Sequence, residues 1–455
     1  MMPNQFEAAA QWNQQYEREV KHTREATASV TIAILRAGTT IARTNLQILS
    51  EPSHIERTCK YMERHIKSLL WIYGGNRILF SGPQILRQKL SDHFKSAPTG
   101  QFDSDLIGEK IYGAPIRIEA VSEHEIPEVN TESQTMGGHL DGCRIGFDLG
   151  GSDRKAAALI DGKVVFSEEI PWDPYFQKDP QYHFDGIMDS LNRAAKHLPR
   201  VDAIGGSAAG VYVDNEVRVA SLFRGVATAD FDQSVRHIFQ RVQKVWNNVP
   251  FVVINDGEVT ALAGAMSLQV SALLGVSMGT STAAGYVTPD GHLTNWLNEL
   301  AFVPVDYSDQ APVDEWSGDR GCAVQFFSQQ GVARLAREVG MNLPPEMPLP
   351  EQLIEVQQHM TAGDPLAQEI YTTIGNAFGH TLAHWSSFYN LEHVLILGRV
   401  TSGSGGDLML SQTRQCLEQH YPQLAAALQL HIPDETMKRH GQAVAAASLP
   451  ALPSS

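Results

Sequence analysis

Cysteine is scarce in this sequence. The 455 residues hold four, and no two of them have a CxxC or CxC spacing: Cys59, Cys143, Cys322 and Cys416. Such isolated cysteines indicate reduced and mostly buried thiols rather than a disulfide framework or a zinc knot. Long apolar runs are absent too, since residues 30–35 are among the longest and are far too short to cross a bilayer. Residues 1–7 lack the basic and then apolar layout of a signal peptide. We therefore expect a cytoplasmic protein without a membrane partner.

Positive charge is also in short supply. The net charge is −16, while 43% hydrophobic and 19% charged residues are ordinary for a globular chain of two or three domains. The excess of acid argues against nucleic acid as a partner of the whole molecule. Residues 1–100 nevertheless hold 13 Lys/Arg and 8 Asp/Glu, a net +5, whereas the rest hold 22 and 43, a net −21. This basic segment has two interpretations: a regulator's nucleic-acid contact, or a face that docks on the acidic body.

The N-terminal part is predicted to be a small α/β unit. Strand candidates occupy residues 30–35 and 40–49, and a helix is predicted over residues 54–73. Ser53 would be the N-cap of this helix, and Glu56 would complete a capping box. The unit lacks the tightly spaced helices of a helix-turn-helix. From Cys143 onward, strands and helices alternate as in an α/β fold.

Farther along, His380 and His384 stand at i and i+4 on one face of a helix predicted over residues 365–389. This spacing can bind a metal, but no acidic third ligand is nearby in the sequence. We interpret both as core or surface histidines.

The strongest pattern in the sequence is a hairpin that occurs twice. Residues 145–164 align without a gap with residues 274–293, so that Gly150 matches Gly279 and Ser152 matches Ser281. Each copy predicts an apolar strand, a turn rich in Gly, Ser and Thr, a second strand and an Asp-Gly turn. Two such turns can grip a polyphosphate through backbone N–H groups and hydroxyls. The alternative is a pair of ordinary β-hairpins in a repeated fold.

The two copies differ in charge at the end of the first strand. The first copy has Asp148 there, and the second has Ser277. This asymmetry suggests an ATP clamp with a metal ion on one side only.

An Asn-Asp pair follows the apolar stretch 251–254. Asn255 and Asp256 would stand at the carboxyl end of a buried strand, where open α/β sheets bind ligands. Asp256 could accept a proton from a substrate hydroxyl while Asn255 binds a neighbouring hydroxyl. The alternative is a helix cap, for which both residue types are common.

The order of these motifs resembles that of the ROK sugar kinases, members of the actin-like ATPase and sugar-kinase superfamily. The resemblance covers residues 143–450. It rests on motifs in order rather than on any one of them: Asp148-Leu-Gly-Gly-Ser152, Asn255-Asp256, the segment 275–285, and Ile396-Leu-Gly398 with Gly403, Gly405 and Gly406. It implies an α/β fold of two ribonuclease-H-like lobes of the actin/hexokinase type, with an additional small α/β N-terminal region. The implied parts are an extension (1–121), a linker (122–140), a first lobe (141–262) and a second lobe (263–455), whose last helix has the option of returning to the first.

The same resemblance assigns roles to residues. Asp256 would be the general base, with Asn255 and Glu299 binding the substrate. Asp148 would hold Mg²⁺ through water, and Gly398 would border the adenosine of ATP. The phosphates would be lined by a further set: Gly150, Gly151, Ser152, Gly279 and Thr280.

The sequence departs from the family where the family has a Glu-x-Gly-His segment and a zinc knot. Phe302 stands at the position of the histidine, Cys322 is the one cysteine of the knot that is kept, and Val324 replaces a sugar-binding glutamate. A lone cysteine cannot make a tetrahedral zinc site, so no structural zinc is expected. New hydroxyl contacts could come from four acids, each of which except Glu299 is better interpreted as a solvated loop acid: Glu299, Asp314, Glu315 and Asp319.

Three functions follow as hypotheses. The first is an ATP-dependent kinase that phosphorylates a hydroxyl of a small-molecule sugar or sugar derivative, with no nucleic-acid partner and with a homo-oligomer as one option. The second is a non-catalytic, sugar-responsive regulator of the same fold. The third is an acetyl- or carboxyl-group kinase, or an ATPase of the same superfamily.

Overall fold

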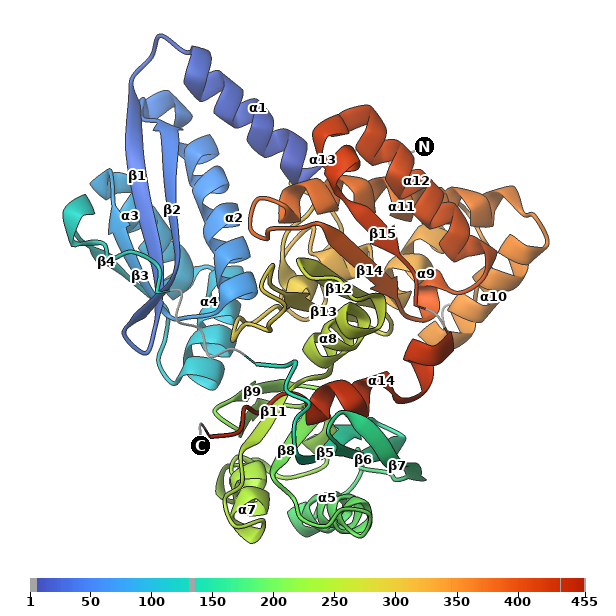
Figure 1. Cartoon of the computed structure of the whole chain (residues 1–455). Coiled ribbons are helices and arrows are strands. Elements are labelled where there is room, and N and C mark those ends of the chain that lie inside the picture. Colours follow the sequence, from blue (N-terminus) through green and yellow to red (C-terminus); the bar gives the residue numbers. More distant parts are fainter. Residues whose placement is uncertain (1–5, 131–135, 345, 434, 454–455) are drawn as a thin grey trace.

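The computed structural model describes residues 6–130, 136–344, 346–433 and 435–453. Figure 1 shows three parts: the N-terminal unit in blue and cyan, a first lobe in green below, and a second lobe in yellow to red above. Among the described residues no helix is long and apolar enough to span a membrane.

The N-terminal unit is a four-stranded sheet with helices on it. The strand order is β2-β1-β3-β4, with β1 antiparallel to both its neighbours. The strands are β1 (Thr27–Arg36), β2 (Thr39–Leu49), β3 (Arg77–Ser81) and β4 (Arg117–Ala120). The helices are α1 (Ala9–His22), α2 (Ile55–Tyr73), α3 (Gln84–Ser96) and α4 (Pro98–Asp103), which continues as a π-helical turn over Ser104–Ile111.

One detail of α2 differs from the prediction. Pro52–His54 form a 3-10 turn, and α2 begins at Ile55 with no side-chain cap, so Ser53 is not its N-cap. Glu56 makes an ion pair with Lys89 at 2.7 Å instead of a capping box. Pro52 is the first residue of the 3-10 turn, so Ser53 lies inside that turn and not at the position that precedes α2.

The first lobe is a five-stranded sheet in the order β11-β8-β5-β6-β7. Strands β5, β8 and β11 are parallel, while β5, β6 and β7 form an antiparallel meander. The strands are β5 (Cys143–Leu149), β6 (Asp153–Ile160), β7 (Lys163–Pro171), β8 (Ala203–Ala208) and β11 (Phe251–Asn255), beside the hairpin of β9 (Val211–Val213) and β10 (Glu216–Val219). The helices are α5 (Pro180–Ala195), α6 (Thr228–Asp230) and α7 (Ile238–Val245).

The second lobe repeats this plan with four strands in the order β13-β12-β14-β15. The strands are β12 (Leu273–Met278), β13 (Thr282–Val287), β14 (His393–Leu397) and β15 (Gln429–His431). The helices are α8 (Asp256–Leu268), α9 (Gln329–Glu338), α10 (Leu349–Thr361), α11 (Pro365–Trp385), α12 (Ser404–His420) and α13 (Pro422–Ala427). An antiparallel hairpin joined to parallel strands in both lobes confirms the predicted ribonuclease-H-like fold.

The last helix, α14 (Glu435–Ala447), lies against the sheet of the first lobe (Figure 1). Two glycines make room for it. A Cβ at Gly146 would stand 1.7 Å from the carbonyl oxygen of Ala443, and one at Gly205 would stand 1.7 Å from that of Ala446. The helix backbone therefore rests directly on β5 and β8.

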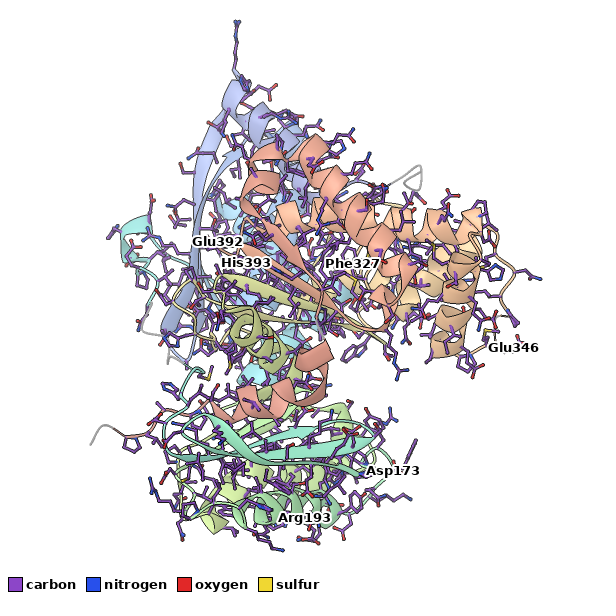
Figure 2. All side chains as sticks on the ribbon, turned by 45° about the vertical axis from the view of Figure 1, so that its right-hand side comes forward. Asp173, Arg193, Phe327, Glu346, Glu392 and His393 are labelled. Atoms are coloured by element: carbon purple, nitrogen blue, oxygen red, sulfur yellow. The ribbon has the colours of Figure 1, made fainter. Side chains whose placement is uncertain are left out.

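The N-terminal unit and the second lobe share one hydrophobic core, whereas the first lobe has a core of its own. This shared core confirms that the basic N-terminal unit packs on the acidic body. Phe327, labelled in Figure 2, lies inside the second lobe, while Asp173 and Arg193 lie on the first.

The cysteines and two histidines fall where the sequence suggested. All four cysteines are free thiols, of which three are buried and Cys59 is half-buried. His380 and His384 are buried in α11, and burial lowers the pKa of their imidazoles to about 4 and about 3. Both are core histidines.

Candidate active site

Asp256 lies where β11 ends and α8 begins. Asn255 is the N-cap of α8: its Oδ1 accepts the N–H of Gly257 at 2.7 Å, and its Nδ2 donates to the carbonyl of Gly210 at 2.7 Å. Both polar groups of Asn255 therefore have backbone partners. Asp256, in the first turn, is half-buried, and its Oδ1 accepts the N–H of Gly257 at 3.0 Å. Burial, and then the charge of Asp148, raise the pKa of Asp256 to about 6.

Asp148 ends β5 and is buried. Its Oδ1 accepts a 2.6 Å hydrogen bond from Ser207, and its Oδ2 lies 3.7 Å from the Lys155 ammonium. Burial raises the pKa of Asp148, and Ser207 and Lys155 oppose that effect. Because β8 alone separates β5 from β11, roughly 10 Å separates the strand that carries Asp148 from the strand that ends just before Asp256.

The two hairpin turns present free backbone donors. The N–H groups of Gly150 and Gly279 bond within their own turns, to the carbonyls of Asp153 and Ser281, both at 2.9 Å. Donors that remain without a partner in the described chain include the N–H groups of three residues that follow: Gly151, Ser152 and Thr280.

Two glycines near these turns allow close approach. A Cβ at Gly151 would stand 2.1 Å from the Tyr175 hydroxyl, and the Arg224 guanidinium lies 4.0 Å from the Tyr175 ring centre. Gly398 has a φ of 106°, and a Cβ there would stand 2.4 Å from the carbonyl oxygen of Met278. Gly398 therefore lies against the strand that leads into the second turn.

Glu299 is half-buried near the buried acid Glu258. Burial, and then the charge of Asp256, raise the pKa of Glu299 to about 7. Glu258, which the sequence did not single out, is buried in α8, where burial raises its pKa to about 8. Its Oε1 accepts the side-chain N–H of Asn298 at 3.1 Å, and Asn298 Oδ1 accepts the Tyr389 hydroxyl at 2.9 Å. The signal for Glu258 was available, as an acid in a helix that is otherwise small and apolar.

The other acids proposed as hydroxyl contacts differ in their surroundings, and two of them are buried. Asp319 is buried and makes ion pairs with Lys67 and Arg64, both at 2.9 Å. Asp314 is buried and accepts both the N–H and the hydroxyl of Ser317 at 2.7 Å. The interpretation of these two as solvated loop acids was therefore wrong, because both are buried and Asp319 is held by two cations of the N-terminal unit.

A small cavity of about 160 Å³ adjoins the second turn. It is lined by apolar and polar side chains: Ala301, Phe302, Trp316 and Val324, and Ser281, Asp314, Glu315 and Gln330. Phe302 and Val324, the two departures from the family pattern, thus lie together and give this cavity its apolar wall.

Comparison with known proteins decides the family. The sequence model of the ROK family matches residues 144–449. The chain belongs to the ROK family. A ROK hexokinase from Thermus thermophilus is 17% identical, with 67% of this chain and 96% of that one covered, at a TM-score of 0.53. A ROK transcriptional regulator, a homologue of the E. coli MLC protein, is 19% identical, with 68% and 79% covered, at 0.51.

A ROK glucokinase from Streptomyces griseus is 18% identical, with 67% and 98% covered, at a TM-score of 0.47. No curated protein matches the sequence. A hexokinase and a transcriptional regulator thus share this fold, so the choice between catalysis and regulation depends on the residues of the site.

Proposed function

We propose that this ROK protein is an ATP-dependent kinase that transfers a phosphoryl group to a hydroxyl of a sugar or sugar derivative. The observation that carries the proposal is the state of Asp256. It is a half-buried aspartate directly after the carboxyl end of a parallel strand, with a pKa raised to about 6 and no cation paired with it in the described chain. A carboxylate with these properties suits a general base near neutral pH.

In the reaction, the acceptor oxygen bonds to the terminal phosphorus of ATP as the bond to the ADP oxygen breaks. Asp256 takes the proton of the acceptor hydroxyl. The free N–H groups of Gly151, Ser152 and Thr280 would hold phosphate oxygens, and Gly398 would border the nucleotide. Glu299 would accept a hydrogen bond from a substrate hydroxyl.

The residues around Asp148 fit a magnesium ion. Its Oδ1 is bonded to Ser207, while its Oδ2 stands beyond hydrogen-bond distance from Lys155. Mg²⁺ is usually bound through one or two carboxylates, several waters and the substrate phosphates, so one such aspartate is sufficient. The ion would supply neutralising charge for the phosphates.

The test is an ATP-consumption assay over a panel of sugars, amino sugars, sugar derivatives and short carboxylic acids. We expect one group of hydroxyl acceptors to stimulate ADP formation. Asp256→Asn should lower that rate roughly 100-fold or more while leaving nucleotide affinity nearly unchanged. Equal turnover by this variant would remove Asp256 from the role of base, and stimulation by a carboxylic acid alone would favour the third hypothesis.

The regulator remains the second candidate, because a transcriptional regulator shares the fold. Many cations of the N-terminal unit, however, already have carboxylate partners: Arg43, Arg57, Lys60, Arg64, Lys67, Arg77 and Lys89. Mobility-shift assays at physiological salt should therefore show only weak, non-specific binding of DNA. A tight, sequence-selective shift would favour the regulator.

A further inference from the structure

The segment that carries Glu299 is held by the N-terminal unit. The backbone N–H of Asn298 donates to the carbonyl of Ile72 at 2.9 Å, and that of Glu299 donates to the carbonyl of Trp71 at 3.0 Å. Both carbonyls lie in the last turn of α2, where a helix leaves its C=O groups without partners inside the helix. The end of α2 therefore fixes the backbone of Glu299 directly.

The same unit contacts this segment on both sides of Glu299. Arg36, at the end of β1, donates to the carbonyl of Asn295. The ring of Tyr73 meets that of Trp296 edge-on, with 4.5 Å between the ring centres, and the rings of Trp71 and Phe302 have their centres 4.3 Å apart. Residues 295–299, which we call the Glu299 segment, thus depend on the N-terminal unit for their position. Figure 1 shows α2 beside the loops drawn in yellow.

A buried ion cluster fixes the end of α2. Lys67, one turn before Trp71 on the same face of the helix, has a fully buried side chain, and its ammonium lies 3.0 Å from Asp103 and 2.9 Å from Asp319. The indole N–H of Trp71 donates to the same Asp103 at 3.0 Å. Arg64, on the same face, binds Asp319 through two bonds of 2.9 and 3.0 Å.

The same cluster is also linked to the chain that follows the Glu299 segment, through the loop that contains Asp319. Asp319 lies in a loop whose Gly321 carbonyl accepts the N–H of Val305 at 2.8 Å, and the N–H of Ala323 donates to the carbonyl of Val303 at 3.0 Å. Lys67 thus links α2, which binds the backbone of Asn298 and Glu299, to the loop that binds the backbone of residues 303 and 305.

We propose that the N-terminal unit positions Glu299 for the acceptor substrate, and that Lys67 is the positioning residue on which this depends. The inference rests on the proposed function for the identity of the substrate, but the positioning itself is independent of it. The nucleotide side should be unaffected, because the hairpin turns of β5–β6 and β12–β13 take no hydrogen bond from α2 in the described chain.

The decisive variant is Lys67→Met, with Lys60→Met as its matched control. Lys60 is on the same helix and pairs with Asp309 across the same boundary at 3.0 Å, but near the surface. We expect Lys67→Met to raise the KM for the acceptor about 10-fold or more, since displacements near 1 Å can cost that much or more, and to leave the KM for ATP within about 2-fold. Lys60→Met should change neither.

Hydrogen exchange gives a second measurement that needs no substrate. The amides of Asn298 and Glu299 should exchange about 10-fold faster in Lys67→Met, while amides of β5 and β12 keep their rates. Trp71→Phe keeps an aromatic ring beside Phe302 but loses the N–H donor to Asp103. It should raise the acceptor KM and the exchange rates too, but by less. If Lys67→Met does not fold, Trp71→Phe is the test variant.

Unchanged exchange at Asn298 and Glu299 in a folded variant would overturn the proposal, whatever the activity. An equal rise in both KM values would overturn it too, because that result indicates general loosening. If no acceptor is phosphorylated by the parent protein, the proposed function fails, and the exchange rates still decide whether the unit positions the segment.

Discussion

The two matched hairpins, β5–β6 in the first lobe and β12–β13 in the second, have the same backbone and different chemistry. In both, the first strand is covered by a helix packed onto a glycine: α14 on Gly146 and α8 on Gly275. The first copy carries the buried Asp148, whereas the second has the uncharged Ser277 at the matching position. Backbone geometry in this fold is therefore set by the small residues, while the chemistry of each copy depends on single side chains.

The largest expected effect comes from removing the negative charge of Asp148, which distinguishes the two hairpins. Asp148→Asn keeps the shape but removes the carboxylate that we propose holds Mg²⁺, so we expect phosphotransfer to fall roughly 100- to 1000-fold, or about 3 to 4 kcal/mol of transition-state stabilisation. Ser277→Ala should change the rate less than about 3-fold. Steady-state kinetics of both variants measure the difference, and a similar loss in both would show that the two hairpins act alike.

The glycines give the next largest effect. Gly146→Ala would place a methyl group 1.7 Å from the backbone oxygen of Ala443, whereas Gly275→Ala would meet the Ala261 Cβ at 2.9 Å. The 1.7 Å contact demands a much larger displacement of its helix than the 2.9 Å contact does, so we expect a loss of about 3 kcal/mol for Gly146→Ala and about 1 kcal/mol for Gly275→Ala. Denaturant unfolding monitored by far-UV circular dichroism measures both. The reverse order would mean that α14 is not firmly packed on β5.

The covering helices also differ in charge, because α8 buries Glu258 against β13 while the described part of α14 that contacts β5 consists of small residues. The pKa of Glu258 is about 8 in the folded protein and near its ordinary 4.5 when unfolded. Below pH 4.5 both states are protonated and burial has no ionic cost. Between pH 4.5 and 8 the unfolded state releases the proton first, so the stability of the parent falls as pH rises.

Glu258→Gln should remove this dependence. Relative to the parent, the variant should gain about 2 kcal/mol of stability between pH 5 and pH 6.5. Glu258→Ala is a poor substitute because it leaves the Asn298 amide without its partner. Parallel slopes of unfolding free energy against pH for parent and Glu258→Gln would show that Glu258 ionises normally in the folded protein.

These contrasts also show what the sequence could and could not predict. The lobes and hairpins follow from local patterns: alternating apolar strands, glycine-rich turns and Asp-Gly pairs. The attachment of the N-terminal unit does not, because Arg64 and Asp319 are 255 positions apart and nothing periodic links them. Asp319 looked like a loop acid for the same reason. The absence of the Ser53 cap depends on a backbone angle set by its proline neighbour.

The smallest expected effect concerns zinc, and it contrasts the second lobe with its relatives rather than with the first. Phe302 packs on Trp71, and the buried Cys322 Sγ lies 3.9 Å from the Ser317 hydroxyl. Both residues therefore have neighbours within the protein. A single thiol cannot make a tetrahedral zinc site. Chelator treatment should therefore shift the thermal midpoint by less than about 1 °C, since a ligand that is not bound adds no stability. Elemental analysis should find no stoichiometric zinc, and one zinc per chain retained after dialysis against the chelator would contradict this. The loop that contains Asp319 is held by the ion pairs of Asp319 with Lys67 and Arg64, so Asp319→Asn should lower the midpoint far more than the chelator does.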